Sequence, residues 1–127
     1  MKKIIETKEA PAPIGAYNQA VLTNGTLYVS GQIALDTESG ELITSDIQSE
    51  AKKVMENLKA VLKAADMNFS NVVKASIFLS DMENFSAVNE IYSSYFNHDT
   101  APARECVQVA ALPKYVNVEI SVIAVES

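Results

Sequence analysis

Apolar residues recur at two different periods along the chain, and these periods predict where its helices and strands lie. Between Asp46 and Ala65 they are three or four positions apart, which is typical of a helix with one buried face. Ser45 and Gln48 have the spacing of a capping box at the start of this helix. The apolar stripe comprises Ile47, Ala51, Val54, Leu58, Leu62 and Ala65.

A strand and a second helix are predicted after this first helix. From Val72 to Leu79 the period becomes two, which places Val73, Ala75, Ile77 and Leu79 on one side of a strand. Asp81 can cap the second helix, whose apolar stripe comprises Phe85, Val88, Tyr92 and Phe96. Asn89 falls on the apolar side of this helix. A polar residue there is usually a buried amide with satisfied hydrogen bonds, and contact with a ligand is the alternative.

The dipeptide Asn24-Gly25 marks a tight hairpin turn between two strand-like runs. A type I′ turn needs positive φ at both central positions, which these two residues tolerate. If Thr23 pairs with Thr26, Tyr17 comes to lie beside the Ser30-Gly31 end of the second strand.

Two further strands are predicted in the last third of the chain, joined around Leu112-Pro113-Lys114. Alternation places Arg104, Cys106 and Gln108 on one face of the first strand, and Asn117, Glu119 and Ser121 on one face of the second. If the two strands form an antiparallel hairpin, their apolar faces must coincide, and so must their polar faces. We therefore expect Cys106 opposite Glu119, with Arg104 diagonal to Glu119.

With a short strand around Lys2–Ile5, the element order is β-β-β-α-β-α-β-β. This order predicts an α+β sandwich over residues 1–127, in one domain, with two helices packed on one face of a single sheet. The other face would combine Arg104 and Glu119 with Phe78 and Tyr28. Such a face is too apolar for a solvent surface and too charged for a monomer core, so we expect it to contact another subunit.

Composition narrows the possible functions. The formal net charge is -6 and the chain has a single arginine, so broad electrostatic binding of nucleic acid is not expected. No apolar run approaches the length of a membrane span, and the N-terminus lacks a signal-peptide core, so we expect a cytoplasmic protein. With only His98 and Cys106 as nitrogen and sulfur ligands, no protein-only metal site is expected. His98 follows the second predicted helix, where a histidine commonly stabilises the helix end.

Several collinear segments resemble those of the RidA (YjgF-like) reactive intermediate deaminases. They are Pro13-Ile-Gly-Ala-Tyr-Asn-Gln-Ala20, Leu27-Tyr-Val-Ser-Gly-Gln-Ile33, Ala101-Pro-Ala-Arg-Glu-Cys-Val107 and Leu112-Pro-Lys114 followed by Glu119. The resemblance implies a homotrimer of chorismate-mutase-like subunits with active sites between neighbours. It also implies hydrolysis of 2-imino acids, such as 2-iminobutanoate and 2-iminopropanoate, to 2-oxo acids and ammonia, without a metal or an organic cofactor.

The residues present accord with this chemistry. A guanidinium such as that of Arg104 can hold the substrate carboxylate bidentately. Glu119 is the candidate for holding and activating the attacking water, and Tyr17 for positioning substrate or relaying a proton. The resemblance also implies substrate contacts for Gly31, Cys106, Ser30 and Asn89, the first two through their backbones.

Alternatives remain for each of these roles. Arg104 and Glu119 could form structural ion pairs, and Tyr17 could be a half-buried aromatic of an interface. Cys106 could be a nucleophile whose pKa Arg104 lowers, although imine hydrolysis needs no covalent intermediate. The whole pocket could bind a 2-oxo acid or another metabolite without turnover, and a ribonuclease, a translation inhibitor or a chaperone-like protein are further alternatives.

Overall fold

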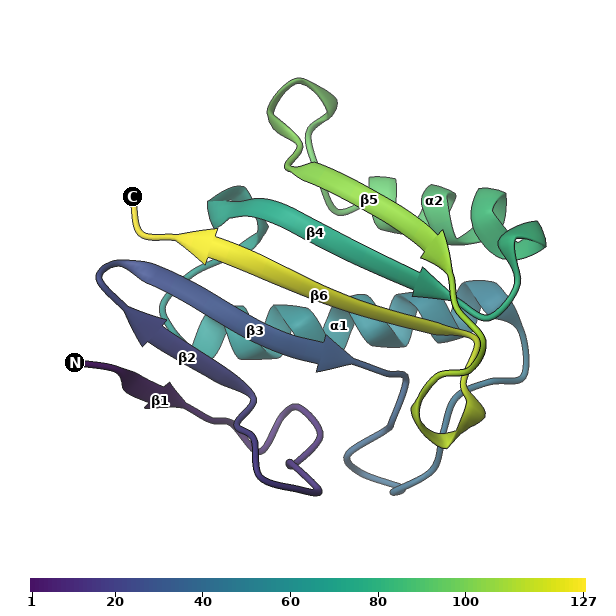
Figure 1. Cartoon of the computed structure of the whole chain (residues 1–127), viewed down its shortest axis with the longest axis horizontal. Helices are drawn as coiled ribbons and strands as arrows, with labels where there is room; N and C mark the ends of the chain where they lie inside the picture. The colour runs from purple at the N-terminus through teal and green to yellow at the C-terminus, as the bar shows by residue number, and fades with distance from the viewer.

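The computed structural model describes residues 1–127 as one six-stranded sheet with both α-helices on the same face (Figure 1). The strands are β1 (Lys3–Ile5), β2 (Ala20–Thr23), β3 (Thr26–Gln32), β4 (Val72–Leu79), β5 (Ala103–Gln108) and β6 (Val118–Val125). The helices are α1 (Ile47–Ala64) and α2 (Phe85–Ser93), with 3-10 turns η1 (Phe69–Asn71), η2 (Met82–Asn84), η3 (His98–Thr100) and η4 (Pro113–Tyr115). The predicted α+β class and the element order are confirmed.

The N-terminal hairpin follows the prediction. Asn24 and Gly25 have φ values of 49° and 77°, and Thr23 pairs with Thr26. At the other end of β3 the pairing with β6 is irregular. Val29 pairs with Val122 and Gln32 pairs with Ile120, so Ser30 and Gly31 both lie opposite the single residue Ser121. Such a bulge bends the strand and redirects the backbone at that point.

Two local predictions are wrong in detail. The N-cap of α1 is Asp46, whose side chain accepts a hydrogen bond from the backbone N–H of Ser49 at 2.8 Å, so the predicted capping box of Ser45 and Gln48 does not form. A carboxylate at this position also interacts favourably with the helix dipole. In β4, an irregularity after Val72 buries that residue and leaves Val73 exposed.

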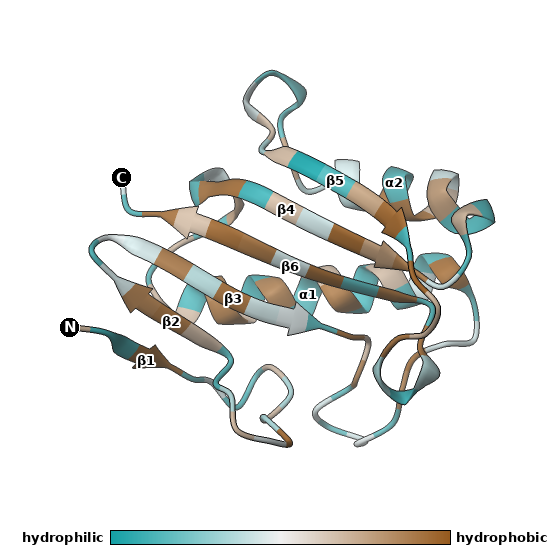
Figure 2. Ribbon diagram, in the orientation of Figure 1, coloured by the Kyte–Doolittle hydropathy of each residue, from teal (hydrophilic) through white to brown (hydrophobic).

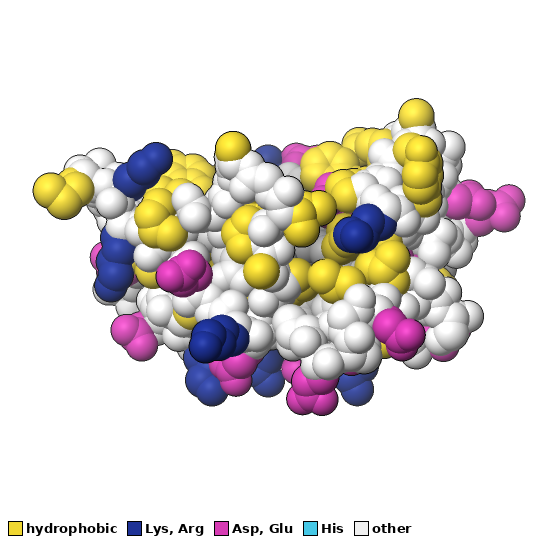
Figure 3. Space-filling view, turned by 90° about the horizontal axis from the view of Figure 1, so that it is seen from below, with side chains coloured by type: hydrophobic (Ala, Val, Ile, Leu, Met, Phe, Trp, Pro, Cys, Tyr) yellow, Lys and Arg dark blue, Asp and Glu magenta, His cyan; other side chains and the backbone are white.

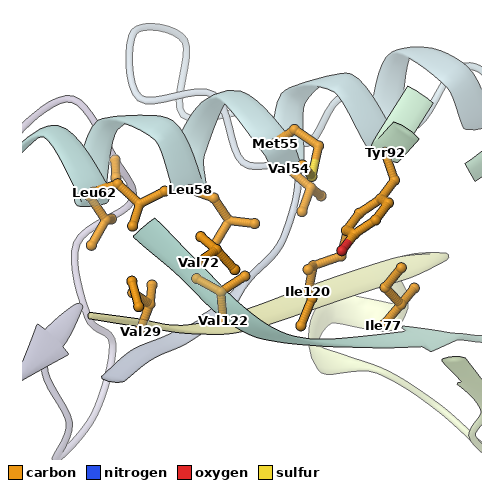
Figure 4. Packing of buried hydrophobic residues seen from close by; sticks show 14 of the residues in the cluster. Val29, Val54, Met55, Leu58, Leu62, Val72, Ile77, Tyr92, Ile120 and Val122 are labelled. Carbon is orange, nitrogen blue, oxygen red and sulfur yellow. The ribbon is translucent and has the colours of Figure 1, made fainter. Parts of the chain in front are cut away.

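The apolar core lies between the helices and the sheet. Figure 2 shows hydrophobic residues along the central strand β6 and alternating with hydrophilic ones along the two helices. In Figure 4, Leu58 and Leu62 of α1 point towards the sheet residues Val29 and Val122, and Tyr92 of α2 lies over Ile120. One connected cluster of 23 buried residues thus fixes the helices on this face.

The predicted pairing of the last two strands is wrong. The strand order is β1-β2-β3-β6-β4-β5, so β6 lies between β3 and β4, while β5 is an edge strand that pairs with β4 in parallel. Helix α2 connects β4 to β5, as parallel neighbours require. The segment after β5 crosses the end of the sheet through η4 and leads into β6 at the centre of the sheet. There every second residue of β6, from Val118 to Ala124, is buried.

The sheet face opposite the helices has no element over it. Its exposed or half-exposed hydrophobic side chains include Val21, Tyr28, Phe78, Val107 and Ile123. Figure 3 views the molecule from one edge of the sheet, and on that side hydrophobic side chains lie mainly in the middle and upper part while most of the charged side chains lie towards the lower margin. None of the helices has both the length and the apolar character of a membrane-spanning segment.

Candidate functional site

The seven predicted site residues lie in two groups on opposite sides of the sheet. The Arg104 group comprises Arg104, Cys106 and Asn89, and the Gly31 group comprises Gly31, Glu119, Tyr17 and Ser30. Arg104 is aligned with Ala75 of β4, which is buried under the helices, whereas Glu119 is aligned with Phe78. Because Ala75 and Phe78 are three residues apart, their side chains point to opposite faces. The predicted diagonal contact between Arg104 and Glu119 is therefore wrong for a single chain.

Helix α2 holds the Arg104 side chain through polar and aromatic contacts. One terminal N–H group of the guanidinium donates to Oδ1 of Asn89 at 2.7 Å. The guanidinium carbon lies 5.0 Å from the ring centroid of Tyr92 and 5.8 Å from that of Phe85. Cation–π contacts at these distances orient a planar guanidinium without neutralising its charge.

Arg104 has no acidic partner. The two ion pairs of the chain join Lys53 to Asp36 and Lys74 to Glu105. The structural ion pair considered for Arg104 does not form, and neither does an ion pair between Glu119 and a lysine. The exposed side of the guanidinium therefore retains N–H donors that can bind an external carboxylate.

A hollow of about 390 Å³ adjoins the Arg104 group. It is lined by Asn89, Tyr92, Ser93, Phe96, His98, Ala101, Pro102 and Arg104. His98 belongs to this lining, which the prediction of a helix-end role did not anticipate. The hydroxyl of Tyr92 is buried without a hydrogen-bond partner and points among apolar core side chains, so only its ring faces Arg104 (Figure 4).

Cys106 has the environment of a packing residue. It is aligned with buried Ile77 and packs against the core cluster. Burial raises the pKa of its thiol and outweighs the opposing effect of the Arg104 charge. Arg104 does lower this pKa, as the nucleophile alternative supposes, but burial raises it by more, and a thiol held in its neutral form is a poor nucleophile.

Replacing Cys106 with alanine is expected to leave the imine hydrolysis that the family resemblance implies within about twofold of the unchanged protein. Only a partly buried sulfur is removed, at a stability cost of about 1 kcal/mol. Steady-state kinetics and thermal unfolding measure the two effects. A folded Cys106→Ala variant without activity would show that the thiol takes part in the reaction.

In the Gly31 group, the Glu119 side chain packs directly against the backbone of Gly31. A Cβ atom at Gly31 would lie 2.8 Å from the carboxyl carbon of Glu119 and 2.9 Å from one of its oxygens. Glycine at the bulge of β3 is therefore what lets the carboxyl group lie over this strand.

Glu119 is a half-buried carboxyl group without a hydrogen-bond or ion-pair partner within the chain. Burial raises its pKa above the usual range of a glutamate. An acid of this kind is poised to exchange a proton with a bound molecule at a pH closer to neutral.

The remaining residues of the Gly31 group lie on the approach to this bulge. Tyr17 is 49% exposed, and its hydroxyl oxygen accepts a long hydrogen bond of 3.4 Å from the N–H of Ile14. Tyr17 and Gly31 line a small cavity of about 50 Å³ together with Lys114. Ser30 is engaged by the chain itself, because its hydroxyl donates to the backbone carbonyl of Asn18 at 2.6 Å.

Three residues that adjoin these groups, Phe85, Tyr92 and Lys114, were not among the predicted site residues. Phe85 and Tyr92 were recognised as core positions, but their spacing around Asn89 on one helix face could have indicated a platform for Arg104. Lys114, whose φ of 54° is unusual for a lysine, gave no such signal. No group of three or more histidine, cysteine, aspartate or glutamate side chains is placed to hold a metal ion.

Comparison with known proteins assigns the chain to a family. The family model described as Endoribonuclease L-PSP matches residues 7–126. The 2-iminobutanoate/2-iminopropanoate deaminase of Rattus norvegicus is 51% identical over 126 residues, which cover 99% of this chain and 91% of that protein.

Solved structures agree in both fold and sequence. YyfA from Yersinia pestis, described as a protein of unknown function of the conserved Rid protein family, superimposes with a TM-score of 0.96 and 45% identity over 99% of this chain and all of the other. TdcF of E. coli, solved with bound serine, gives a TM-score of 0.92 and 42% identity over 98% of this chain and 99% of the other. The chain therefore belongs to the Endoribonuclease L-PSP family, which is the RidA/YjgF family that its motifs resemble.

Proposed function

We propose that this protein hydrolyses small 2-imino acids to 2-oxo acids and ammonia. The observation that carries the proposal is the presence of two functional groups of opposite charge, the Arg104 guanidinium and the Glu119 carboxyl group, neither of which is neutralised within the chain. The names of the relatives support the same chemistry, since several that are 45–51% identical are 2-iminobutanoate/2-iminopropanoate deaminases.

Arg104 binds the substrate carboxylate. A carboxylate has two oxygens in one plane, and a guanidinium presents two parallel N–H groups to them. Asn89, Tyr92 and Phe85 hold the guanidinium in one orientation, so little side-chain entropy is lost when the substrate binds. Cys106 forms part of the wall and contacts the substrate through its backbone.

Glu119 binds the attacking water and takes its proton. The water oxygen adds to the imine carbon while the imine nitrogen gains a proton, which gives a carbinolamine. The amino nitrogen of the carbinolamine then gains a proton, the C–N bond breaks with its electron pair going to nitrogen, and ammonia departs as the hydroxyl group loses its proton and the C=O bond of the 2-oxo acid forms. A carboxyl group with a raised pKa can accept and return these protons. Tyr17 and Ser30 line the approach, and the Gly31 backbone contacts the substrate.

The site is completed between subunits. Arg104 and Glu119 of one chain face opposite sides of the sheet, so one chain cannot present both to a single small molecule. The uncovered sheet face carries Glu119 and exposed hydrophobic residues, which favours its burial against another copy. We therefore propose a homotrimer in which the Gly31 group of one subunit meets the Arg104 group of its neighbour. The cytoplasmic location inferred from the sequence stays a prediction.

A coupled assay tests the proposed function. Threonine dehydratase generates 2-iminobutanoate in situ, and adding this protein is expected to accelerate the disappearance of the imine and the appearance of 2-oxobutanoate. If the imine decays no faster than in buffer while 2-oxobutanoate still binds, the pocket is a binding module and the enzymatic proposal fails. RNA cleavage that survives purification and is lost in Arg104→Ala would instead support a ribonuclease.

A further inference from the structure

A buried carboxylate outside the proposed site controls the backbone next to Glu119. Glu50 is completely buried, in the first turn of α1. It is the only acidic residue of the chain that is buried. The N-terminal turn of a helix favours negative charge, but a helix dipole alone does not compensate for full burial of a carboxylate.

Both oxygens of Glu50 bind the segment that leads into β6. One oxygen accepts from the side-chain amide of Asn117 at 2.8 Å. The other accepts from the backbone N–H of Asn117 at 2.8 Å and from that of Val118 at 3.2 Å. Three N–H donors on two consecutive residues therefore converge on one side chain, and we call this arrangement the Glu50 clamp.

Asn117, which Glu50 binds, also joins the segment before β6 to the end of β4. The backbone carbonyl of Asn117 accepts from the N–H of Ser80, which directly follows β4, at 3.1 Å. The turn η4 lies immediately before the clamp, and its residues Lys114 and Tyr115 both have positive φ, at 54° and 55°. Such a turn is costly for residues other than glycine and persists only where its surroundings fix it. The clamp fixes its C-terminal end.

Glu119 directly follows Val118, the second of the two residues that Glu50 binds. Its carboxyl group has no hydrogen-bond partner of its own, so backbone position and packing against Gly31 determine where it lies. A shift of the β6 start relative to α1 would displace Glu119 from the bulge of β3. A displacement of about 1 Å is enough to cost up to two orders of magnitude in rate when a group must meet a bound substrate.

We propose that Glu50 is a positioning residue for Glu119. Its hydrogen bonds fix the distance between α1 and the start of β6, and this holds the Glu119 carboxyl group against Gly31. The catalytic consequence rests on the proposed function, whereas the placement of Glu119 does not. This positioning depends on the length of the side chain at position 50 and not on its charge. A glutamine there keeps one oxygen to accept from the two backbone N–H groups, and the Asn117 side chain can rotate so that its oxygen accepts from the glutamine NH₂ group.

Two substitutions separate length from charge. Glu50→Asp keeps the charge but shortens the side chain by one methylene, so kcat is expected to fall about 10- to 100-fold, while the affinity for 2-oxobutanoate at Arg104 stays within about twofold. Glu50→Gln keeps the length and is expected to retain kcat within about threefold. Asn71→Ala is the matched control, because the Asn71 side chain binds the carbonyl of Val125 at the far end of β6. It is expected to lower thermal stability without changing kcat.

An NMR titration of the Glu119 carboxyl group in ¹³C-labelled protein gives a readout independent of turnover. Glu50→Asp is expected to move the pKa of Glu119 towards its ordinary value, whereas Glu50→Gln and Asn71→Ala leave it unchanged. If Glu50→Asp does not fold, Asn117→Ala replaces it, with smaller changes expected in the same direction.

The proposal is overturned if the shortened variant has unchanged kcat and an unchanged Glu119 titration, or if the Asn71→Ala control reproduces both effects. Absence of imine hydrolysis in the unsubstituted protein would overturn the proposed function only, because the titration still decides whether Glu50 positions Glu119.

Discussion

Replacing Arg104 with alanine is expected to lower kcat/KM for 2-iminobutanoate by about three orders of magnitude. A hydrogen bond to a charged group contributes about 1.5–3 kcal/mol, and a bidentate pair provides two of them. Since each 1.4 kcal/mol corresponds to a factor of ten, losing both accounts for this decrease. The aromatic rings of Phe85 and Tyr92 provide no substitute, because Phe85 has no hydrogen-bonding group and the Tyr92 hydroxyl is buried.

Replacing Arg104 with lysine separates the contribution of the guanidinium geometry to kcat/KM from that of its positive charge. Arg104→Lys keeps the positive charge but loses the planar fork, so it is expected to recover only part of kcat/KM, about tenfold over alanine. Asn89→Ala leaves the guanidinium in place without its 2.7 Å acceptor and is expected to lower kcat/KM by less than either. Steady-state kinetics in the coupled assay and calorimetric binding of 2-oxobutanoate measure these effects. Equal activity of the arginine and alanine proteins would mean that the carboxylate is bound elsewhere.

The sequence predicts local structure here better than strand pairing. The α1 stripe, the Asn24-Gly25 turn and the span of β4 are encoded within windows of a few residues, and the structure has them close to the predicted positions. The pairing of β5 and β6 depends instead on which strand occupies the centre of the sheet. A connection of nine residues, from 109 to 117, resembles a hairpin loop in sequence but passes across the end of the sheet.

The wrong pairing of β5 and β6 also limited how much of the candidate site could be predicted. Alternation correctly placed Arg104 and Cys106 on one face of their strand, and Glu119 on one face of another. It could not decide how the faces of two strands match, because that depends on a third strand, β4, lying between them. Asn89 was recognised as unusual on its helix, but its bond to Arg104 joins α2 to β5 and is not visible in any local pattern.

Correcting the strand order strengthens the case for an oligomeric site. A hairpin of β5 and β6 would have formed a complete site within one chain. In the observed topology the cation lies beside α2 and the carboxyl group on the uncovered face, so the proposed site needs residues from two chains. A dilution series that dissociates the proposed oligomer should therefore abolish turnover while the chain stays folded. A site shared by two subunits is lost when they separate.

Replacing Glu119 with glutamine is expected to lower kcat by about two to four orders of magnitude, the range expected when a general base is removed. Binding of 2-oxobutanoate should change by no more than a few fold, because Arg104 binds the carboxylate of the 2-oxo acid whereas Glu119 acts on the attacking water. In the unsubstituted protein, activity should fall as the pH decreases through the raised pKa of Glu119, since the protonated carboxyl group cannot accept a proton from water. A kcat of Glu119→Gln close to that of the original protein would exclude this carboxyl group as the base.

The stability of the same variant has an expected sign as well. Because burial raises the pKa of Glu119, the folded state binds its proton more tightly than the unfolded state, and the free energy of unfolding falls as the pH rises from the ordinary to the raised value. Glutamine removes this dependence, so Glu119→Gln should equal the original protein at acidic pH and exceed its stability at neutral pH. Glu105 is the matched comparison, because hydrogen bonds from Ser76 and Lys74 lower its pKa. Glu105→Gln should therefore lose stability at neutral pH, and urea unfolding at both pH values would show the opposite signs. If Glu119→Gln instead loses stability at neutral pH, its carboxylate has a partner in the assembled protein, and a neighbouring subunit is where that partner lies.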